Sequence, residues 1–277
     1  MKKTRAIFLN GEIVFAVEAL RKSLAPGRLK GKGVFETLRV YNGKIFALAP
    51  HVRRLNAGLK KIKVVCPFSR PAIKRYFYQI VRLNKHPNTR VRLTVWSEAG
   101  KSRMAIVAYP YRPYSTSKYQ KGFKACLADE RLPFRRGYHN VKSIQYAAFA
   151  RARQNAARKG CDEAILVNRK NELVEGSRSN IFIVKNRRLL TPAFVSGCLN
   201  GITRQIIFKL AKKIGLRVRP MNLSPQDIVQ ADEVFLTNSL MEIMPLTVWQ
   251  GRPIAQGKPG PFTERLMREY KKLREAA

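Results

Sequence analysis

The stretch over residues 138–182 reads YHNVKSIQYAAFARARQNAARKGCDEAILVNRKNELVEGSRSNIF. It places Lys142 at the start of a helical pattern over residues 143–159. A predicted strand over 162–167, a turn, and a second short strand lead to Glu175, which Gly-Ser-Arg-Ser-Asn follows. The stretch therefore predicts mixed helix and strand structure, with one lysine before the helix and one carboxylate at a strand end.

A lysine and a distant carboxylate form the pair that a pyridoxal phosphate site needs. The lysine amine makes a Schiff base with the cofactor aldehyde, and the carboxylate pairs with the pyridinium nitrogen so that the ring accepts electrons. However, the chain has 55 Lys and Arg residues. Without other support, Lys142 is more simply interpreted as a solvated surface charge, so further motifs must decide between the two interpretations.

Four further motifs accompany this stretch. They are GKGVFETLRVY at 31–41, H-x-x-R-L at 51–55, G-I-T-R at 201–204 and DEVFLTNSLMEIMPL at 232–246. In order and spacing they resemble the class IV aminotransferase family, the fold-type IV pyridoxal phosphate enzymes. That family includes branched-chain aminotransferases, D-amino acid aminotransferases and 4-amino-4-deoxychorismate lyases. The resemblance covers nearly the full chain.

The resemblance implies an α+β or α/β fold with two domains, as in fold-type IV enzymes, and the chain length accommodates two modest domains. We expect a small N-terminal α/β domain over residues 1–110. Residues 111–119, rich in Pro, Ser and Tyr, are the expected interdomain linker. Residues 120–277 are the expected large cofactor-binding domain, with a β-barrel-like core flanked by helices.

The resemblance also assigns site residues. Lys142 would hold the cofactor and move protons, and Glu175 would pair with the ring nitrogen. Thr37 is a second catalytic candidate, because lyases of the family carry threonine there and branched-chain enzymes tend to carry glycine. The other implied cofactor-binding residues are Arg54, Tyr146, Ile202, Thr203, Asn238 and Ser239, and the implied substrate-binding residues are Phe35 and Arg92.

Residue chemistry agrees with two of these assignments. The planar, permanently charged fork of Arg54 suits a dianionic phosphate. The free backbone amides at the helix start near Thr203 form a natural anion site. Two of the assigned residues also have a plainer interpretation: Thr37 as a β-branched strand residue, and Thr203 as a helix cap.

The implied reaction has two possible outcomes. Thr37, the turn at residues 237–239 and the short chain favour 4-amino-4-deoxychorismate lyase, which forms p-aminobenzoate and pyruvate. The alternative is an aminotransferase of the branched-chain or D-amino acid type, which moves an amino group to a 2-oxo acid. A third class, a polyanion-binding protein, is suggested only by the charge.

The net charge of +38 is extreme for a metabolic enzyme. The basic residues are spread through nearly every predicted element, as in ARARQNAARKG and REYKKLREAA, and no nucleic-acid-binding signature accompanies them. This pattern indicates a charge-biased or resurfaced enzyme with non-specific polyanion adhesion as a side effect.

Other sequence features concern location and assembly. No apolar run is long enough for a transmembrane helix, and the apolar part of the N-terminus is too short for a signal peptide. The four cysteines show no metal-ligand spacing, so we expect free thiols in a reducing cytoplasm and no metal. The resemblance implies a homodimer, although like charges would oppose association at low salt.

Overall fold

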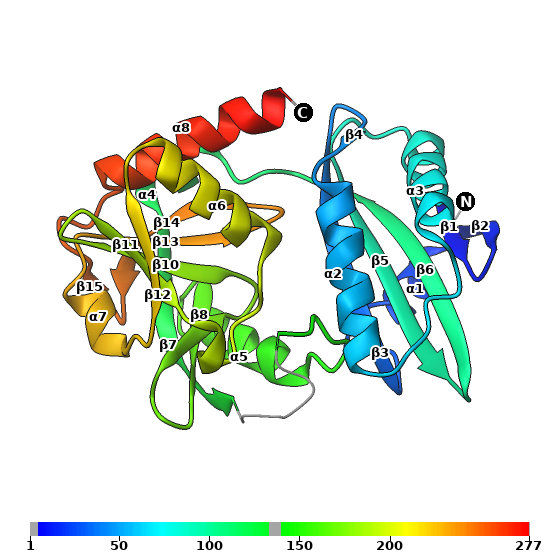
Figure 1. The fold of residues 1–277 in the computed structure, drawn as a ribbon, viewed down its shortest axis with the longest axis horizontal. Coiled ribbons are helices and arrows are strands. Elements are labelled where there is room, and N and C mark those ends of the chain that lie inside the picture. The colour runs from blue at the N-terminus through cyan, green and yellow to red at the C-terminus, as the bar shows by residue number, and fades with distance from the viewer. Residues whose placement is uncertain (1–4, 133–139, 277) are drawn as a thin grey trace. The chain divides into compact units, whose positions relative to one another are not determined.

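The computed structural model describes residues 5–132 and 140–276, so Tyr138 and His139 lie outside the described residues. The chain forms two compact units, coloured along the chain in Figure 1. The first comprises Met1–Arg112 and Val141–Tyr146, and the second comprises Pro113–Asn140 and Ala147–Ala277. Two details differ from the expected domain boundaries. Val141–Tyr146 belongs to the first unit, and helix α4 (Thr116–Lys121) begins within the expected linker.

The first unit contains a six-stranded antiparallel sheet with the order β2-β1-β6-β5-β3-β4. Its strands are β1 (Arg5–Leu9), β2 (Glu12–Ala16), β3 (Lys32–Tyr41), β4 (Lys44–Ile45), β5 (Thr89–Glu98) and β6 (Lys101–Pro110). Asn-Gly pairs, which are strong sequence signals for two-residue hairpin turns, join β1 to β2 at Asn10-Gly11 and β3 to β4 at Asn42-Gly43. Asn10 and Asn42 both have positive φ, as tight hairpin turns require.

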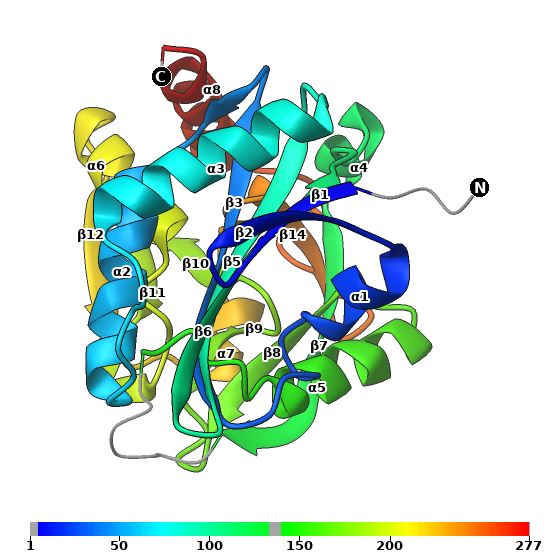
Figure 2. The same cartoon turned by 90° about the vertical axis from the view of Figure 1, so that its right-hand side faces the viewer.

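Helices cover the sheet of the first unit because they carry apolar stripes. Helices α2 (Leu48–Lys61) and α3 (Arg70–Asn84) lie on the same face of the sheet, as Figures 1 and 2 show. Val52, Leu55 and Leu59 form the buried stripe of α2. The short helix α1 (Glu18–Ser23) lies toward the opposite face, where the Tyr109 hydroxyl donates to the Arg21 carbonyl.

The segment that carries Lys142 is extended rather than helical. Helix α5 spans Ala147–Arg158, so the predicted helical start at residue 143 is wrong by four residues. Ser143 forms an antiparallel bridge with Val34, and the Phe35 N–H donates to the Lys142 carbonyl at 2.9 Å. Strand pairing with β3 satisfies backbone groups that would otherwise lie at a sheet edge, and this outweighs the local helical periodicity.

The second unit contains a curled, mixed sheet of nine strands with the path β12-β11-β10-β13-β14-β7-β8-β9, and β15 pairs with β14. Its strands are β7 (Phe123–Leu132), β8 (Glu163–Asn168), β9 (Leu173–Gly176), β10 (Asn180–Lys185), β11 (Arg188–Pro192), β12 (Arg217–Met221), β13 (Glu233–Asn238), β14 (Glu242–Trp249) and β15 (Arg252–Pro253). One face encloses a buried core that includes Phe123, Ile181 and Leu236.

Helices pack on the outside of this sheet. Helix α5 covers β7 and β8 through small buried residues such as Ala152 and Ala156. Helices α6 (Ile202–Lys213) and α8 (Pro261–Glu275) pack against β13, and α7 (Pro225–Val229) and the short 3-10 helix η1 (Phe194–Ser196) complete the unit. Among residues 5–132 and 140–276, no helix is long and apolar enough to cross a membrane. All four cysteines are free.

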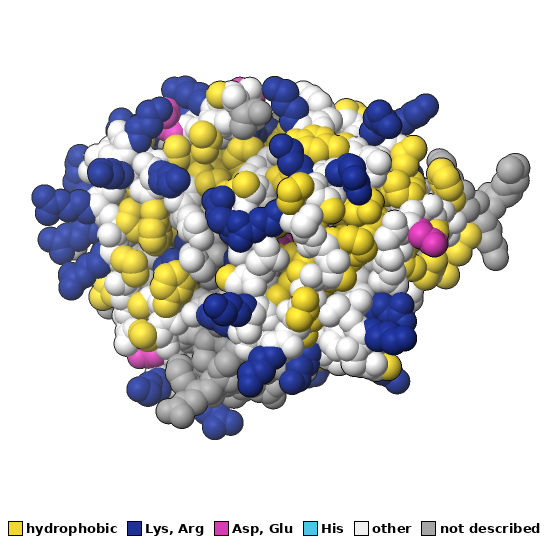
Figure 3. Space-filling view, turned by 45° about the vertical axis from the view of Figure 1, so that its right-hand side comes forward, with side chains coloured by type: hydrophobic (Ala, Val, Ile, Leu, Met, Phe, Trp, Pro, Cys, Tyr) yellow, Lys and Arg dark blue, Asp and Glu magenta, His cyan; other side chains and the backbone are white. Residues whose placement is uncertain are grey.

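Charged side chains are distributed differently at the surface and in the interior. On the face drawn in Figure 3, blue Lys and Arg side chains are spread widely, whereas magenta acidic side chains are few. Glu36, Glu163 and Glu233 are instead buried. A buried carboxylate needs several donors, so these three positions indicate local polar networks.

Candidate active site

The first unit gathers five of the predicted site residues on one face of its sheet. Thr37 on β3 lies opposite Arg92 on β5, and Phe35 points to the same face two residues earlier. The bridge between Val34 and Ser143 puts Lys142 opposite Phe35. The Lys142 Nζ lies 4.8 Å from the centre of the Phe35 ring, and the Tyr146 ring packs edge-on against Phe35 with centroids 5.7 Å apart.

Arg92 has the properties of an anion-binding side chain. It lies 5.6 Å from the Tyr109 ring centre, and Arg90 lies 4.6 Å from the same ring. The Arg92 Nε is buried and has no hydrogen-bond partner. Burial is the main cause that lowers the Arg92 pKa, and neighbouring Arg90 lowers it further. A substrate carboxylate would supply a hydrogen-bond acceptor for Nε and a negative charge beside the guanidinium.

Arg54 lies on the opposite face of the sheet, where α2 meets β3. Its Nε and Nη2 donate to the two oxygens of Glu36 at 2.7 and 2.6 Å. The His51 Nδ1 makes a third hydrogen bond to Glu36 at 2.7 Å. One edge of the Arg54 fork is therefore engaged by a buried carboxylate, a partner that the sequence motif did not predict.

The Glu36 carboxylate stays ionised because of these partners. Burial alone would raise its pKa, but the charge and hydrogen bonds of Arg54, together with His51, lower it to about 2. Burial lowers the pKa of His51 from 6.5, with Glu36 opposing that change. His51 is therefore mainly neutral at pH 7, so Arg54 supplies the positive charge that stabilises Glu36.

In the second unit, Glu175 lies near the end of β9 and is tied to the segment before α6. Its Oε2 accepts a hydrogen bond from the Leu199 N–H at 3.1 Å and one from the Asn180 Nδ2 at 3.3 Å. The Asn180 Nδ2 also donates to the Leu199 carbonyl at 2.9 Å. Asn180 thus links the predicted ring-nitrogen partner to the turn predicted to bind phosphate. The E-G-S-R-S-N motif contained Asn180, but only its spatial contacts indicate this role.

The N-terminus of α6 has the features of an anion site. Gly201 is its N-cap and provides no side-chain cap, while Ile202 and Thr203 begin the helix and are buried. The first helical amides have no intrahelical acceptors, and the helix dipole favours an anion there. Gly201 is required by close approach, because a Cβ at this position would overlap the Asn180 Oδ1.

Thr237 is a candidate that sequence reasoning missed. It lies directly opposite Asn180 in the pairing of β10 with β13, on the same face. Its Oγ1 is buried and lacks a hydrogen-bond partner. An orphaned hydroxyl opposite the residue that contacts Gly201 is consistent with a ligand oxygen or a water at this position.

Asn238 and Ser239 lie at the turn between β13 and β14. The Asn238 Oδ1 accepts hydrogen bonds from the Leu240 and Met241 N–H groups at 2.9 and 2.8 Å. Its Nδ2 donates to the Arg178 carbonyl at 3.1 Å. Both ends of the Asn238 amide are thus engaged by the protein, which favours a role in shaping the turn that presents Ser239.

Each unit, taken by itself, carries groups that suit a part of pyridoxal phosphate. The first unit supplies a lysine amine beside an aromatic ring. The second supplies a carboxylate at the end of β9 and a helix N-terminus that lacks a side-chain cap. An aldehyde, a pyridine nitrogen and a phosphate require these three kinds of partner. No group of three or more potential metal ligands occurs within the described ranges.

Comparisons with known proteins agree with this chemistry. The amino-transferase class IV family matches residues 33–249. A Methanocaldococcus jannaschii protein, provisionally named a branched-chain-amino-acid aminotransferase, is 33% identical over 97% of this chain and 96% of its own length. D-alanine aminotransferase of Listeria monocytogenes is 31% identical over 94% and 93%. Aminodeoxychorismate lyase of Bacillus subtilis is 31% identical over 87% and 85%.

Solved structures extend the similarity to the whole fold. Escherichia coli branched-chain amino acid aminotransferase superposes with a TM-score of 0.87 and 26% identity, covering 98% of this chain and 94% of that one. The branched-chain enzyme of Thermobaculum terrenum in its pyridoxal-phosphate form gives 0.84 and 25%, covering 99% and 94%. The predicted fold-type IV architecture is thereby confirmed. The chain belongs to the amino-transferase class IV family and is a pyridoxal-phosphate-dependent transaminase or lyase of that family.

Proposed function

We propose that the protein is an aminotransferase that moves an amino group from an amino acid to a 2-oxo acid. The observation that carries this proposal is the shared sheet face of Lys142, Phe35 and Arg92. The Lys142 amine lies on the same face as the Arg92 guanidinium, whose Nε has no hydrogen-bond partner and which is suited to a carboxylate. Relatives named as D-alanine and branched-chain aminotransferases support it over the lyase that the sequence favoured.

Each residue then has a defined task. When bound, pyridoxal phosphate withdraws electrons from the substrate Cα, which allows the Cα–H bond to release a proton. The Lys142 Nζ would hold the cofactor aldehyde carbon and later accept and return this proton. The Glu175 carboxylate would keep the ring nitrogen protonated. Arg92 would bind the substrate carboxylate, and Phe35 would pack against the reacting groups.

The phosphate would be held by the N-terminus of α6. The amides of Ile202 and Thr203 would donate to it, with the hydroxyl of Ser239 as a further donor. Arg54, held in place by its hydrogen bonds to Glu36, would contribute a positive charge. Tyr146, packed edge-on against Phe35, would donate to the phenolic oxygen of the cofactor. Asn238 would shape the turn rather than contact the cofactor.

Two measurements test this proposal. The protein mixed with pyridoxal phosphate should show a visible absorbance band that borohydride bleaches, and Lys142→Ala should remove that band. The holoenzyme should then form glutamate from 2-oxoglutarate with D-alanine or with L-leucine as amino donor. A colourless protein would refute the cofactor assignment. A coloured protein inactive on D- and L-amino acids alike would refute the aminotransferase assignment alone.

A second candidate function, 4-amino-4-deoxychorismate lyase, is favoured by Thr37. Its side chain lies opposite Arg92 on the substrate-facing side, where the resemblance places a lyase threonine. The lyase of Bacillus subtilis is also among the relatives. Release of p-aminobenzoate and pyruvate from 4-amino-4-deoxychorismate would establish this activity. Loss of that release in Thr37→Val, with transamination retained, would assign it to the hydroxyl.

A further inference from the structure

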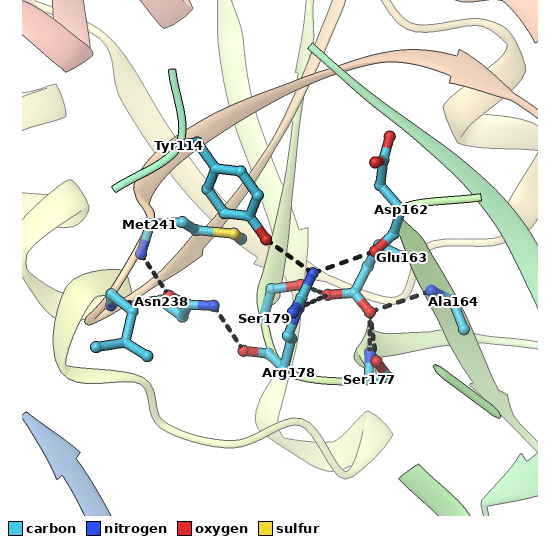
Figure 4. A network of polar contacts seen from close by, with 10 residues as sticks. Tyr114, Asp162, Glu163, Ala164, Ser177, Arg178, Ser179, Asn238 and Met241 are labelled. Atoms are coloured by element: carbon cyan, nitrogen blue, oxygen red, sulfur yellow. Dashed lines mark hydrogen bonds and ion pairs between the residues drawn. The ribbon is translucent and has the colours of Figure 1, made fainter. Parts of the chain in front are cut away.

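A buried carboxylate that has no role in the proposed chemistry organises the second unit. Glu163, the first residue of β8, is fully buried. Its Oε1 accepts hydrogen bonds from the backbone N–H groups of Ala164 and Ser177, both at 3.1 Å, and from the Ser177 hydroxyl. Its Oε2 accepts one from the Ser179 hydroxyl at 2.9 Å. Figure 4 shows these donors converging on one carboxylate.

Arg178, between the two serines, extends the network. Its Nε lies 3.7 Å from the Glu163 Oε2, close enough for charge attraction but too far for a hydrogen bond. Its Nη2 donates to the Tyr114 hydroxyl at 3.2 Å and to the Asp162 carbonyl at 3.3 Å. Its own carbonyl accepts from the Asn238 Nδ2 at 3.1 Å, as Figure 4 shows. The loop over 176–179 is thus joined to the turn over 238–241.

These two segments carry residues that the proposed function assigns to the cofactor. Glu175 immediately precedes the loop, and Ser239 lies within the turn. The backbone of the loop over 176–179 has little room to move. A Cβ on Gly176 would overlap the Ser179 hydroxyl and lie 3.2 Å from the Glu163 side chain, and the Gly176 N–H donates to the Ser179 carbonyl at 2.7 Å. Small shifts of the Glu163 carboxylate would therefore move the backbone next to Glu175.

We propose that Glu163 is a positioning residue of the cofactor site, which holds Glu175 and Ser239 in place through the loop over 176–179 and Asn238. The proposal rests on the proposed function, since it concerns cofactor contacts. Its competitor is a purely structural role, in which Glu163 stabilises the second unit without influencing the cofactor. The two roles differ in what a substitution changes beyond stability.

The chain provides a matched control in Glu233. This residue is also a buried acid of the same sheet, at the start of β13. It accepts hydrogen bonds from the Phe262 N–H at 3.0 Å and from the N–H and hydroxyl of Thr263, both at 2.7 Å. These donors belong to the first turn of α8, so Glu233 caps that helix. Among the described residues, no hydrogen bond of Glu233 reaches a segment assigned to the cofactor.

The experiment compares Glu163→Gln with Glu233→Gln in the full-length apoprotein. Unfolding in urea should show that both variants lose stability. Binding of pyridoxine 5′-phosphate, followed by its fluorescence, measures the noncovalent contacts of the cofactor, because this probe lacks the aldehyde that Lys142 would capture. We expect Glu163→Gln to weaken this binding about 10-fold, since misplaced site groups commonly cost one to two orders of magnitude. Glu233→Gln should change it less than about twofold.

Several outcomes separate the possibilities. Equal effects of the two variants on probe binding, including no effect of either, would overturn the positioning role and leave Glu163 structural. Should Glu163→Gln fail to fold, Arg178→Lys replaces it, because lysine keeps the charge but loses the fork that reaches Tyr114 and Asp162. Weakened probe binding by Arg178→Lys supports the proposal, and unchanged binding overturns it. If the wild-type protein does not bind the probe, the proposed function fails instead.

Discussion

Replacing Glu36 with glutamine should remove a pH-dependent part of the stability of the first unit. Burial alone would raise the Glu36 pKa, but the contacts with Arg54 and His51 lower it from 4.5 to about 2 in the folded protein. At about 1.4 kcal/mol per unit, this shift corresponds to about 3 kcal/mol of stabilisation at pH 7. Because Glu36 is fully buried, solvent does not screen the interaction with Arg54.

The sign of the pH dependence follows from the lowered pKa. Well above pH 4.5 the carboxylate is ionised in both the folded and unfolded states, so the full stabilisation is present. As pH falls from 4.5 toward 2, the unfolded state takes up a proton first, and the stabilisation is lost. By pH 3, about 2 kcal/mol of it should be gone for these two pKa values.

The assay is urea unfolding of the wild-type protein and Glu36→Gln at pH values from about 7 to about 3. The difference in free energy of unfolding should be about 3 kcal/mol at pH 7 and about 1 kcal/mol at pH 3. Titration of the other acidic groups occurs in both proteins and cancels in the difference. A difference that stays constant over this range would refute the lowered pKa, and a difference near zero at pH 7 would refute the stabilising role of the network.

Four other outcomes are expected. His51→Asn should reduce the loss of stability that accompanies a fall in pH below about 6.5, because burial lowers the pKa of the imidazole and its protonation therefore favours the unfolded state; denaturant titrations at several pH values check this. Gly201→Ala should weaken pyridoxine 5′-phosphate binding about 10-fold, because the new Cβ would displace Asn180 from the start of α6; the fluorescence titration measures it. Arg92→Met should raise KM for the 2-oxo acid about 10- to 100-fold, because a charged hydrogen bond to the substrate carboxylate is worth about 1.5–3 kcal/mol. The change in kcat should be smaller, and steady-state kinetics will measure both constants. Retention on immobilised DNA should fall steeply as salt rises, whereas turnover measured in parallel should change little, because the surface charge is not part of the site.

Local signals in the sequence predicted much of the fold. The Asn10-Gly11 and Asn42-Gly43 turns lie where the hairpins form, because both asparagines adopt the positive φ that such turns need. The G-I-T-R motif begins α6 at Ile202. The start of α5 could not be predicted in this way, because residues 142–144 pair with β3, which is about a hundred positions earlier in the chain.

The site was predictable as a set of residues but not as a set of contacts. The motifs singled out Arg54 for a phosphate, yet nothing local indicates that Glu36, eighteen positions away, takes one edge of its guanidinium. Asn180 and Thr237 face each other only because β10 and β13 pair in one register. Such pairings depend on packing of the whole sheet, which a linear pattern of residue types does not specify.

The buried acids explain how a chain with a net charge of +38 keeps an ordered interior. Glu36, Glu163 and Glu233 each accept at least three hydrogen bonds from side chains or backbone amides. A basic residue at any of these positions would leave those donors unpaired and bury a positive charge without a partner, which costs several kcal/mol. Replacing an exposed acid with a basic residue carries no such penalty, because a surface ion pair contributes about 1 kcal/mol or less to stability. A bias toward Lys and Arg can therefore accumulate at the surface without disturbing these networks. Salt should accordingly weaken adhesion to polyanions and like-charge repulsion between copies of the chain, while leaving the buried contacts that position the cofactor site largely unchanged.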